Sequence, residues 1–471
     1  MRDGSAKRWV LALTSLASFI VVLDTQVLTV ALTTIRTDLH ASIEALQWTV
    51  NAYTLSMAVL LLTGAALGDR FGRRRTFVWG IALFVAASAA CACAQNTNWL
   101  IAARVVQGAA AAAIMPLAMA LLTVAFPPEE RGKALGIFTG LTGLAVFCGP
   151  VVGGAVTLGL SWHAIFWINV PLGLIAIPLI LARIPESSRP GTTFDLAGVG
   201  LVSGGIFGLV WGLVRANADG WTNPAVIASL GAGMLLVAAF VAWEARARAP
   251  MVPLRLFASR SFVSGNLASF LYNAALYGTL FFLPQFFQTA QGSDALGAGL
   301  RILPWTATLF VVAPLAGSAV NRIGERWLVV VGLLLQAAGI AWLAAIAAPN
   351  VAYAQLIAPL IVAGTGVSMA MPATQRAVLN SVAPADVGKA SGTYSMLRFL
   401  GAIFGVAVAV AVFGHAGALT SPHAFSAGFV AAMGFSAILS LVGAVAGMWT
   451  PNVALSAAVV ARSRPSPASG V

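Results

Sequence analysis

Apolar runs of about 20 residues recur along the whole chain, separated by short polar or proline- and glycine-containing breaks. A helix needs about that length to cross the hydrocarbon core of a membrane. The pattern therefore predicts an all-α membrane protein with fourteen transmembrane helices. We place them at residues 10–34, 46–68, 76–95, 99–122, 133–157, 164–182, 195–214, 224–243, 262–288, 298–319, 327–346, 352–378, 390–413 and 426–447.

Composition supports the same class. The 471 residues are 59% hydrophobic and only 8% charged, which excludes a water-soluble enzyme, and the repeated runs exclude a signal peptide followed by one soluble domain. The net charge of +12 is spread over short loops, so it does not indicate nucleic-acid binding. The cysteines Cys91, Cys93 and Cys148 lie inside predicted spans and are interpreted as small core residues.

The basic residues predict how the chain crosses the membrane. If the N-terminus is cytoplasmic, Arg36, Arg215 and Arg301 are the only Lys or Arg residues in outer loops. Arg104 and Arg398 lie within spans, and all the others lie on the cytoplasmic side. The positive-inside rule then predicts a multi-pass protein of the inner (plasma) membrane with both termini cytoplasmic.

An internal repeat predicts two similar halves. Residues 128–136 read PEERGKALG and residues 384–392 read PADVGKASG, each following a helix with a matching Gly and Pro. Two six-helix bundles of this kind would meet at a central cavity. The predicted order is a cytoplasmic N-terminus at 1–9, a bundle at 10–183, two additional spans at 195–243, a second bundle at 262–447 and a disordered cytoplasmic tail at 448–471.

The loop between the second and third spans reads GDRFGRRR over residues 68–75. As a basic loop it could bind carboxylates or anionic lipid headgroups. It also resembles the G-x-L-a-D-r-x-G-r-r signature of the major facilitator superfamily, although Ala65 replaces the leading glycine. The resemblance implies a charge latch that stabilises the outward-open state and breaks as the halves rock, formed by Asp69, Arg70, Gly72, Arg73 and Arg74.

Arg104 lies inside the fourth span, where a charge is costly unless it faces a partner or a wet cavity. One alternative is an arginine that extends to the outer surface. The segment Arg104-Val-Val-Gln-Gly108 resembles the R-x-x-q-G motif of proton-driven exporters in the superfamily. The resemblance implies a role for Arg104 in proton coupling.

The fifth span contains a glycine- and proline-rich segment, CGPVVGG, over residues 148–154. Glycines allow close helix contact and proline permits bending, although ordinary transmembrane packing uses glycine too. The segment resembles the antiporter motif G-P-x-x-G-G, which is typical of exporters in the superfamily. The resemblance therefore indicates export, with the motif formed by Gly149, Pro150, Gly153 and Gly154.

Asp24 lies near the centre of the first span, in the segment LDTQVLTVAL. This segment resembles the first-span motif l-D-x-T-x-v-N-v-A-l-P of drug:proton antiporters, with Thr29 and Thr33 in place of Asn and Pro. A carboxylate that alternates between dry and charged surroundings can load and release a proton, so we expect Asp24 to be the proton site. A permanent structural ion pair is the alternative. Arg104 is the leading candidate partner, and Arg398 is the second.

Polar and aromatic residues of several spans are candidates for a substrate cavity. Aromatic residues near span ends, such as Trp48, also serve as membrane-interface anchors. No phosphate-binding loop occurs, and the four histidines lack metal-ligand spacing, so we expect no catalytic residue, metal or cofactor. The expected cavity residues are Gln26, Asn51, Tyr53, Met115, Tyr272, Asn273 and Arg398.

Together these motifs predict a member of the fourteen-span drug:proton antiporter branch of the major facilitator superfamily. It would act as a monomer in the lipid bilayer and export lipophilic drugs or antibiotics in exchange for protons, with cationic compounds among the candidate substrates. A nutrient or anion importer on the same fold is the first alternative. A receptor or lipid-handling protein that transports nothing is the second.

Overall fold

The computed structural model describes residues 4–187, 195–247, 250–383 and 386–451, and every regular element in these ranges is helical. We call α1–α7 the N-terminal half: α1 (Gly4–Asp38), α2 (Ile43–Phe71), α3 (Arg73–Ala92), α4 (Thr97–Ala125), α5 (Pro128–Gly159), α6 (Ala164–Trp167) and α7 (Asn169–Arg183). Next come α8 (Leu196–Asp219) and α9 (Pro224–Glu244). The remaining elements form the C-terminal half: η1 (Leu254–Ala258), α10 (Arg260–Gln285), η2 (Phe286–Ala290), α11 (Ala295–Ile323), α12 (Glu325–Ile346), α13 (Tyr353–Asn380), α14 (Val387–Ala416) and α15 (Pro422–Met448).

The described helices agree with the predicted number of spans. Thirteen are long and apolar enough to cross a membrane, with α6 and α7 forming one span together. The two parts of α2 meet at an angle of 50°, and counting them as one span gives up to fourteen. The predicted all-α membrane fold is therefore confirmed.

Several helices extend beyond the predicted apolar runs. For example, α1 begins at Gly4, inside the segment predicted as an N-terminus, and ends at Asp38. Backbone hydrogen bonds and capping side chains keep a helix intact after its sequence turns polar, and Ser42 and Asn96 cap α2 and α4 in this way. Most of the predicted tail, residues 452–471, lies outside the described residues.

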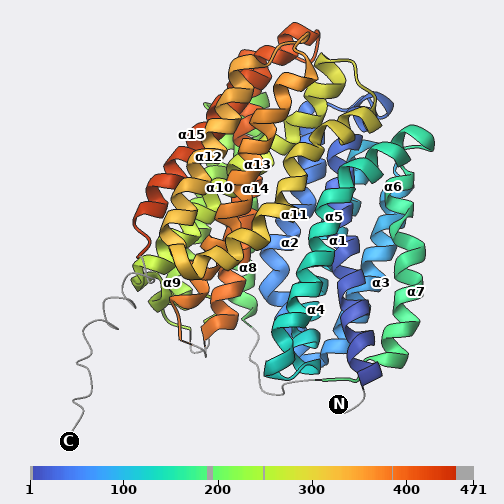
Figure 1. The fold of residues 1–471 in the computed structure, drawn as a ribbon, viewed down its shortest axis with the longest axis vertical. Coiled ribbons are helices and arrows are strands. Elements are labelled where there is room, and N and C mark those ends of the chain that lie inside the picture. Colours follow the sequence, from blue (N-terminus) through green and yellow to red (C-terminus); the bar gives the residue numbers. More distant parts are fainter. Residues whose placement is uncertain (1–3, 188–194, 248–249, 384–385, 452–471) are drawn as a thin grey trace, which may run out of the picture.

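The two halves lie side by side, and α8 packs against both α2 and α14 (Figure 1). The helix α1 begins, and α15 ends, toward the lower end of this view, which we call the terminal end. We call the opposite end the distal end.

The predicted repeat has a counterpart in helix packing. In α4, a side chain at Gly108 would meet the backbone of Tyr53 in α2. In α13, a side chain at the matching Gly364 would lie 2.6 Å from the carbonyl oxygen of Trp305 in α11. Both contacts bring two backbones together where a larger residue would separate them. The matching glycines thus serve the same close helix contact in each half.

The glycines of α14 give a prediction for stability. We expect Gly405→Ala to lower the free energy of unfolding by about 1–3 kcal/mol, because the added methyl group would overlap the carbonyl oxygen of Ala274 in α10. We expect Gly414→Ala, in the same helix, to be neutral or stabilising by up to about 1 kcal/mol, because nothing lies within 4 Å of the new Cβ. Thermal unfolding in detergent measures both, and equal melting temperatures would contradict the α10–α14 contact.

Candidate functional site

The structure pairs Asp24 with Arg104. The distance between the Oδ2 atom of Asp24 and the Nη1 atom of Arg104 is 2.5 Å. Asp24 is fully buried and the Arg104 side chain is only 1% exposed, so the pair lies inside the N-terminal half. A buried charge of this kind requires a partner, and the geometry identifies Arg104 rather than Arg398.

Three neutral side chains complete the environment of the pair. The amides of Gln107 and Asn169 each donate to the Oδ1 atom of Asp24, at 2.8 and 2.9 Å. Both amides also donate to the hydroxyl of Ser88, at 2.8 and 3.3 Å. We call Asp24, Ser88, Arg104, Gln107 and Asn169 the buried network. It connects α1, α3, α4 and α7, so a change in the charge of Asp24 would alter hydrogen bonds that join four helices.

Arg104 also contacts groups on the side facing the C-terminal half. Its Nε atom donates to the carbonyl oxygen of Thr49 at 3.3 Å, and its guanidinium lies 4.1 Å from the ring centre of Tyr53. Arg104 borders a void of about 10 Å³, which Val50 and Phe281 also line. This volume accommodates about one water molecule. The void therefore places Arg104 of the buried network beside residues of both halves.

A cavity of about 210 Å³ lies between the two halves. Its wall is mostly apolar and aromatic, with a few polar groups such as Thr25, Asn273 and Tyr277. Six of the seven expected cavity residues line it: Gln26, Tyr53, Met115, Tyr272, Asn273 and Arg398. A cavity of this character suits an amphipathic small molecule.

One expectation about the cavity differs from the structure. Asn51 is buried and does not line the cavity, and its amide has no hydrogen-bond partner among the described residues. Asp24 does not line it either, whereas Thr25 and Gln26, the next two residues of α1, do. Successive helical residues point about 100° apart, so a rotation of one helix decides which of them faces a cavity.

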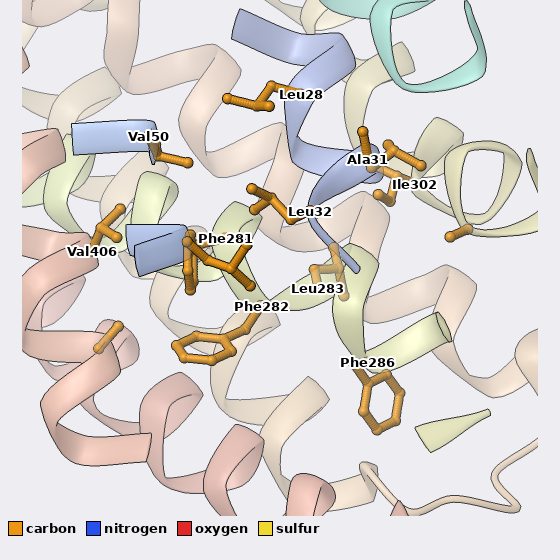
Figure 2. Packing of buried hydrophobic residues seen from close by; sticks show 14 of the residues in the cluster. Leu28, Ala31, Leu32, Val50, Phe281, Phe282, Leu283, Phe286, Ile302 and Val406 are labelled. Atoms are coloured by element: carbon orange, nitrogen blue, oxygen red, sulfur yellow. The ribbon is translucent and has the colours of Figure 1, made fainter. Parts of the chain in front are cut away.

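Apolar side chains from both halves close the cavity at its distal side. Leu28, Ala31, Leu32 and Val50 meet residues of α10, η2, α11 and α14 in one buried cluster, which we call the distal seal (Figure 2). A hydrogen bond of 2.9 Å from the amide of Gln288 to the carbonyl oxygen of Val30 also joins the halves there. The C-terminal members of the seal that Figure 2 labels are Phe281, Phe282, Leu283, Phe286, Ile302 and Val406.

The glycines of the predicted antiporter motif lie at helix contacts. A side chain at Gly149 or Gly153 would overlap Gln26 or the backbone of Val27 in α1. A Cβ at Gly154 would lie 2.5 Å from the carbonyl oxygen of Ala295 in α11. The motif therefore fits α5 against α1 within one half and against α11 of the other half.

The contact between α5 and α11 stops near the middle of the molecule. It continues from Gly154 to the ring contact between Phe147 and Phe310, whose centres are 6.1 Å apart. Closer to the terminal end, side chains at Gly143, Gly140 or Gly136 would meet nothing within 4 Å. Along this helix pair the halves touch at the distal end and separate toward the terminal end.

The predicted latch residues make their described contacts within the N-terminal half. Asp69 accepts from Arg73 at 2.7 Å. Glu186, just after α7, accepts from the backbone N–H groups of Arg74 and Arg75 at 2.9 and 3.1 Å. Gly72 has a φ of +105°, which favours glycine, and a side chain there would also meet Glu186. Arg70 lies over the ring of Phe71.

Four residues of these arrangements were not among the predicted site residues. Gln107 lies in the quoted Arg104-Val-Val-Gln-Gly108 segment, one helical turn after Arg104, and this spacing could have indicated it. Ser88, Asn169 and Glu186 carry no comparable signal, because single small or amide residues are common in transmembrane helices and loops. Only the packing of α3 against α4 and α7, and of α4 and α7 against α1, brings these residues into the arrangements described above.

Two helical halves around a central cavity, closed at one end, define a membrane transporter. The family profile of the Major Facilitator Superfamily matches residues 14–307 and 265–469, and the chain belongs to this family. The chain is 35% identical to the tetracenomycin C resistance and export protein of Streptomyces glaucescens, covering 82% of this chain and 72% of that protein. It is 36% identical to the cephamycin export protein CmcT of Amycolatopsis lactamdurans, covering 86% and 84%.

A solved structure shows the same fold at low sequence identity. The peptide transporter POT in complex with sulfate superposes with a TM-score of 0.68 at 14% identity, covering 96% of this chain and 94% of that one. The predicted family and the predicted likeness to its drug-export members are thus confirmed, and the chain is a multi-pass membrane transporter rather than an enzyme.

Proposed function

We propose that this protein is a proton-coupled antiporter that exports lipophilic drugs or antibiotics across the plasma membrane by alternating access. The observation that carries the proposal is the buried Asp24–Arg104 pair, which lies beside a cavity shared by both halves. A paired acid in the interior of a transport protein is typical of a proton site. The similarity to antibiotic export proteins supports the direction and the kind of substrate.

The geometry suggests how the two movements are linked. In this structure Asp24 accepts hydrogen bonds from Arg104, Gln107 and Asn169, so both of its oxygens are occupied. A proton on Asp24 would remove the charge that holds Arg104. The void beside Arg104 is closed distally by Val50 and Phe281 of the distal seal, and separation of the seal would open it to external protons.

The proposed cycle moves one substrate outward and protons inward. With the termini in the cytoplasm, the terminal end faces inward, and a compound enters the cavity while Asp24 is paired. The halves then rock, the distal seal opens, an external proton neutralises Asp24 and the compound leaves. The empty protein returns and Asp24 releases its proton inside. Asp69, Arg70, Arg73 and Arg74, with Gly72 at the turn, act as the conformational latch.

The same geometry supports a monomer as the transport unit. The cavity lies between two halves of one chain, so no second copy is needed to enclose it. The basic loops favour cytoplasmic termini in the inner membrane.

Transport direction and energy source can be measured together. We expect cells that express the protein to become resistant to at least one antibiotic of a broad panel. In proteoliposomes that start with the same concentration of that compound on both sides, an imposed pH gradient should drive its net movement and build up a concentration gradient, because the proton supplies the free energy. Nigericin, which removes the pH gradient, should stop this movement at once.

Two results would contradict the proposal. One is movement that continues after nigericin and requires ATP. The other is expression that increases the uptake of a nutrient or anion in right-side-out vesicles without exporting any compound of the panel, which would favour an importer.

A further inference from the structure

Arg398 is the charged residue of the cavity wall. Among the residues that line the cavity in the described part of the chain, no Asp, Glu, Lys or His occurs beside it. The polar groups around it are neutral hydroxyls and amides, such as those of Thr25, Gln26, Asn273 and Tyr277. The cavity therefore presents one positive charge within an otherwise uncharged wall.

No carboxylate or hydrogen-bond acceptor of the described residues compensates the charge of Arg398. It forms no ion pair and no hydrogen bond there, and its guanidinium lies over the ring of Phe399 at 4.7 Å. The other arginine at membrane depth, Arg104, is bound by Asp24. Arg376, elsewhere in the C-terminal half, lies 3.4 Å from a carboxylate oxygen of Glu325. An unpaired arginine at membrane depth is costly, and its persistence beside a cavity indicates a ligand that supplies the missing charge.

Asp24, the proposed proton site, cannot attract a cationic ligand that Arg398 repels. Asp24 is fully buried, does not line the cavity, and already binds Arg104, Gln107 and Asn169. An organic cation in the cavity would therefore meet one repulsive charge and no attractive one. An anion would form charge-assisted hydrogen bonds with a guanidinium in a water-poor space, where such bonds are strong.

The rest of the wall indicates what the anionic group is attached to. Met57, Met115, Met371, Trp305 and Phe399 provide broad apolar and aromatic surface. Methionine side chains adapt to ligands of different shape, and aromatic rings stack on flat ones. The wall thus fits a hydrophobic, partly aromatic body that carries a single negative group.

We propose that Arg398 selects amphipathic organic monoanions as substrates, such as compounds with one carboxylate, sulfonate or enolate on an apolar skeleton. The inference rests on the proposed export function and replaces the expectation of cationic substrates with the opposite charge. Arg398 contacts the anionic group directly, while the apolar wall holds the body.

Two fluorescent probes that differ in one charged group test this selectivity. 8-Anilinonaphthalene-1-sulfonate is an aromatic monoanion, and N-phenyl-1-naphthylamine is the same skeleton without the sulfonate. Both accept energy from tryptophan, and Trp305 lines the cavity. Titration of the purified full chain in nanodiscs, with empty nanodiscs subtracted, gives a Kd for each probe.

We expect the unaltered protein to bind the sulfonate about tenfold more tightly than the amine, because a hydrogen-bonded ion pair forms with the first probe alone. In Arg398→Gln this preference should disappear through loss of sulfonate binding, with amine binding unchanged. Arg398→Lys, which keeps the charge, should retain most of the preference. Ethidium, an aromatic cation, should bind Arg398→Gln more tightly than the unaltered protein.

The inference is overturned if the unaltered protein binds the amine or ethidium as tightly as the sulfonate, a result that needs no variant to fold. It is also overturned if Arg398→Gln keeps the preference. The proteoliposome experiment with an imposed pH gradient separates this inference from the proposed function. Proton-driven export of neutral or cationic compounds alone would leave the function standing and reject the inference. Selective binding of the sulfonate without proton-driven export of any compound would reject the proposed function and leave the charge selectivity of the cavity standing.

Discussion

Replacing Asp24 with Asn is expected to abolish transport driven by a pH gradient. Asn keeps one acceptor oxygen and carries a donating Nδ2 group, so it cannot accept from Arg104 and from the amides of Gln107 and Asn169 together, and the charge that pairs with Arg104 is lost. Removal of one partner of a buried pair costs about 3–5 kcal/mol of stability, because the remaining charge is left without compensation. Loss of activity could therefore have two causes, and the measurement has to separate them.

The double variant Asp24→Asn/Arg104→Gln separates stability from coupling. It removes both charges, so its melting temperature should recover most of the loss seen in Asp24→Asn. Coupling should stay absent, since no titrating group remains in the buried network. Ser88→Ala is the matched control within that network, because it removes one uncharged acceptor and should cost only about 1 kcal/mol while coupling persists.

Proteoliposomes provide the decisive measurement. Asp24→Asn and the double variant should still exchange substrate down its gradient, but an imposed pH gradient should not accelerate either of them. If Asp24→Asn still accumulated substrate against its gradient in response to pH, Asp24 would not be the coupling site. If the double variant were no more stable than the single one, the unpaired arginine would not explain the instability.

Replacing Gly154 with Val is expected to shift the protein toward a state that is open at the distal end. The new Cβ would lie 2.5 Å from the carbonyl oxygen of Ala295 and 2.7 Å from the Cα atom of Leu296. Backbone atoms cannot rotate away as a side chain can, so α5 and α11 have to separate. Overpacking of this kind costs about 1–3 kcal/mol, and about 1.4 kcal/mol changes a conformational equilibrium tenfold.

Gly143→Val is the matched control, since it introduces the same side chain in the same helix with nothing within 4 Å of its Cβ. Spin labels at the exposed positions Leu160 and Asn350, which lie at the distal end in different halves, report the separation. They require a background in which the native cysteines are replaced. Gly154→Val should lengthen the main distance and lower transport, whereas Gly143→Val should leave the distance distribution unchanged.

An unchanged distance in Gly154→Val would show that the α5–α11 contact does not hold the distal end closed. A lengthened distance in both glycine variants would point to a general effect of valine in α5. The experiment thus tests the close approach itself and not only the presence of a glycine-rich motif.

Much of the architecture could be predicted because it depends on local composition. Apolar runs between polar breaks predicted the spans, and the matching segments at 128–136 and 384–392 predicted two related halves. Asp24 and Arg104 could be recognised without coordinates, because a charge in the middle of an apolar helix is expensive and has to be explained. The likeness of several motifs to those of drug exporters agrees with the relatives found.

Other parts of the site could not be predicted because they depend on distances between helices. The motif around Arg104 made it the leading candidate partner of Asp24, but no distance from Asp24 to Arg104 or Arg398 could be derived from the sequence, and Ser88 and Asn169 gave no signal of their own. The expected cavity position of Asn51 was not observed, since the rotation of α2 places that side chain away from the cavity. A helical wheel gives relative directions within one helix but not the direction of its neighbours.

The sequence by itself determined that this is a membrane protein with up to fourteen spans, and which charges within them need partners, because membrane insertion depends on the hydrophobicity of each segment in turn. The tertiary structure alone decided that Asp24 binds Arg104 inside one half, that Arg398 stands unpaired within the described ranges beside the cavity, and that Gly154 touches the opposite half. Those outcomes follow from helix rotation and packing, to which every neighbouring helix contributes.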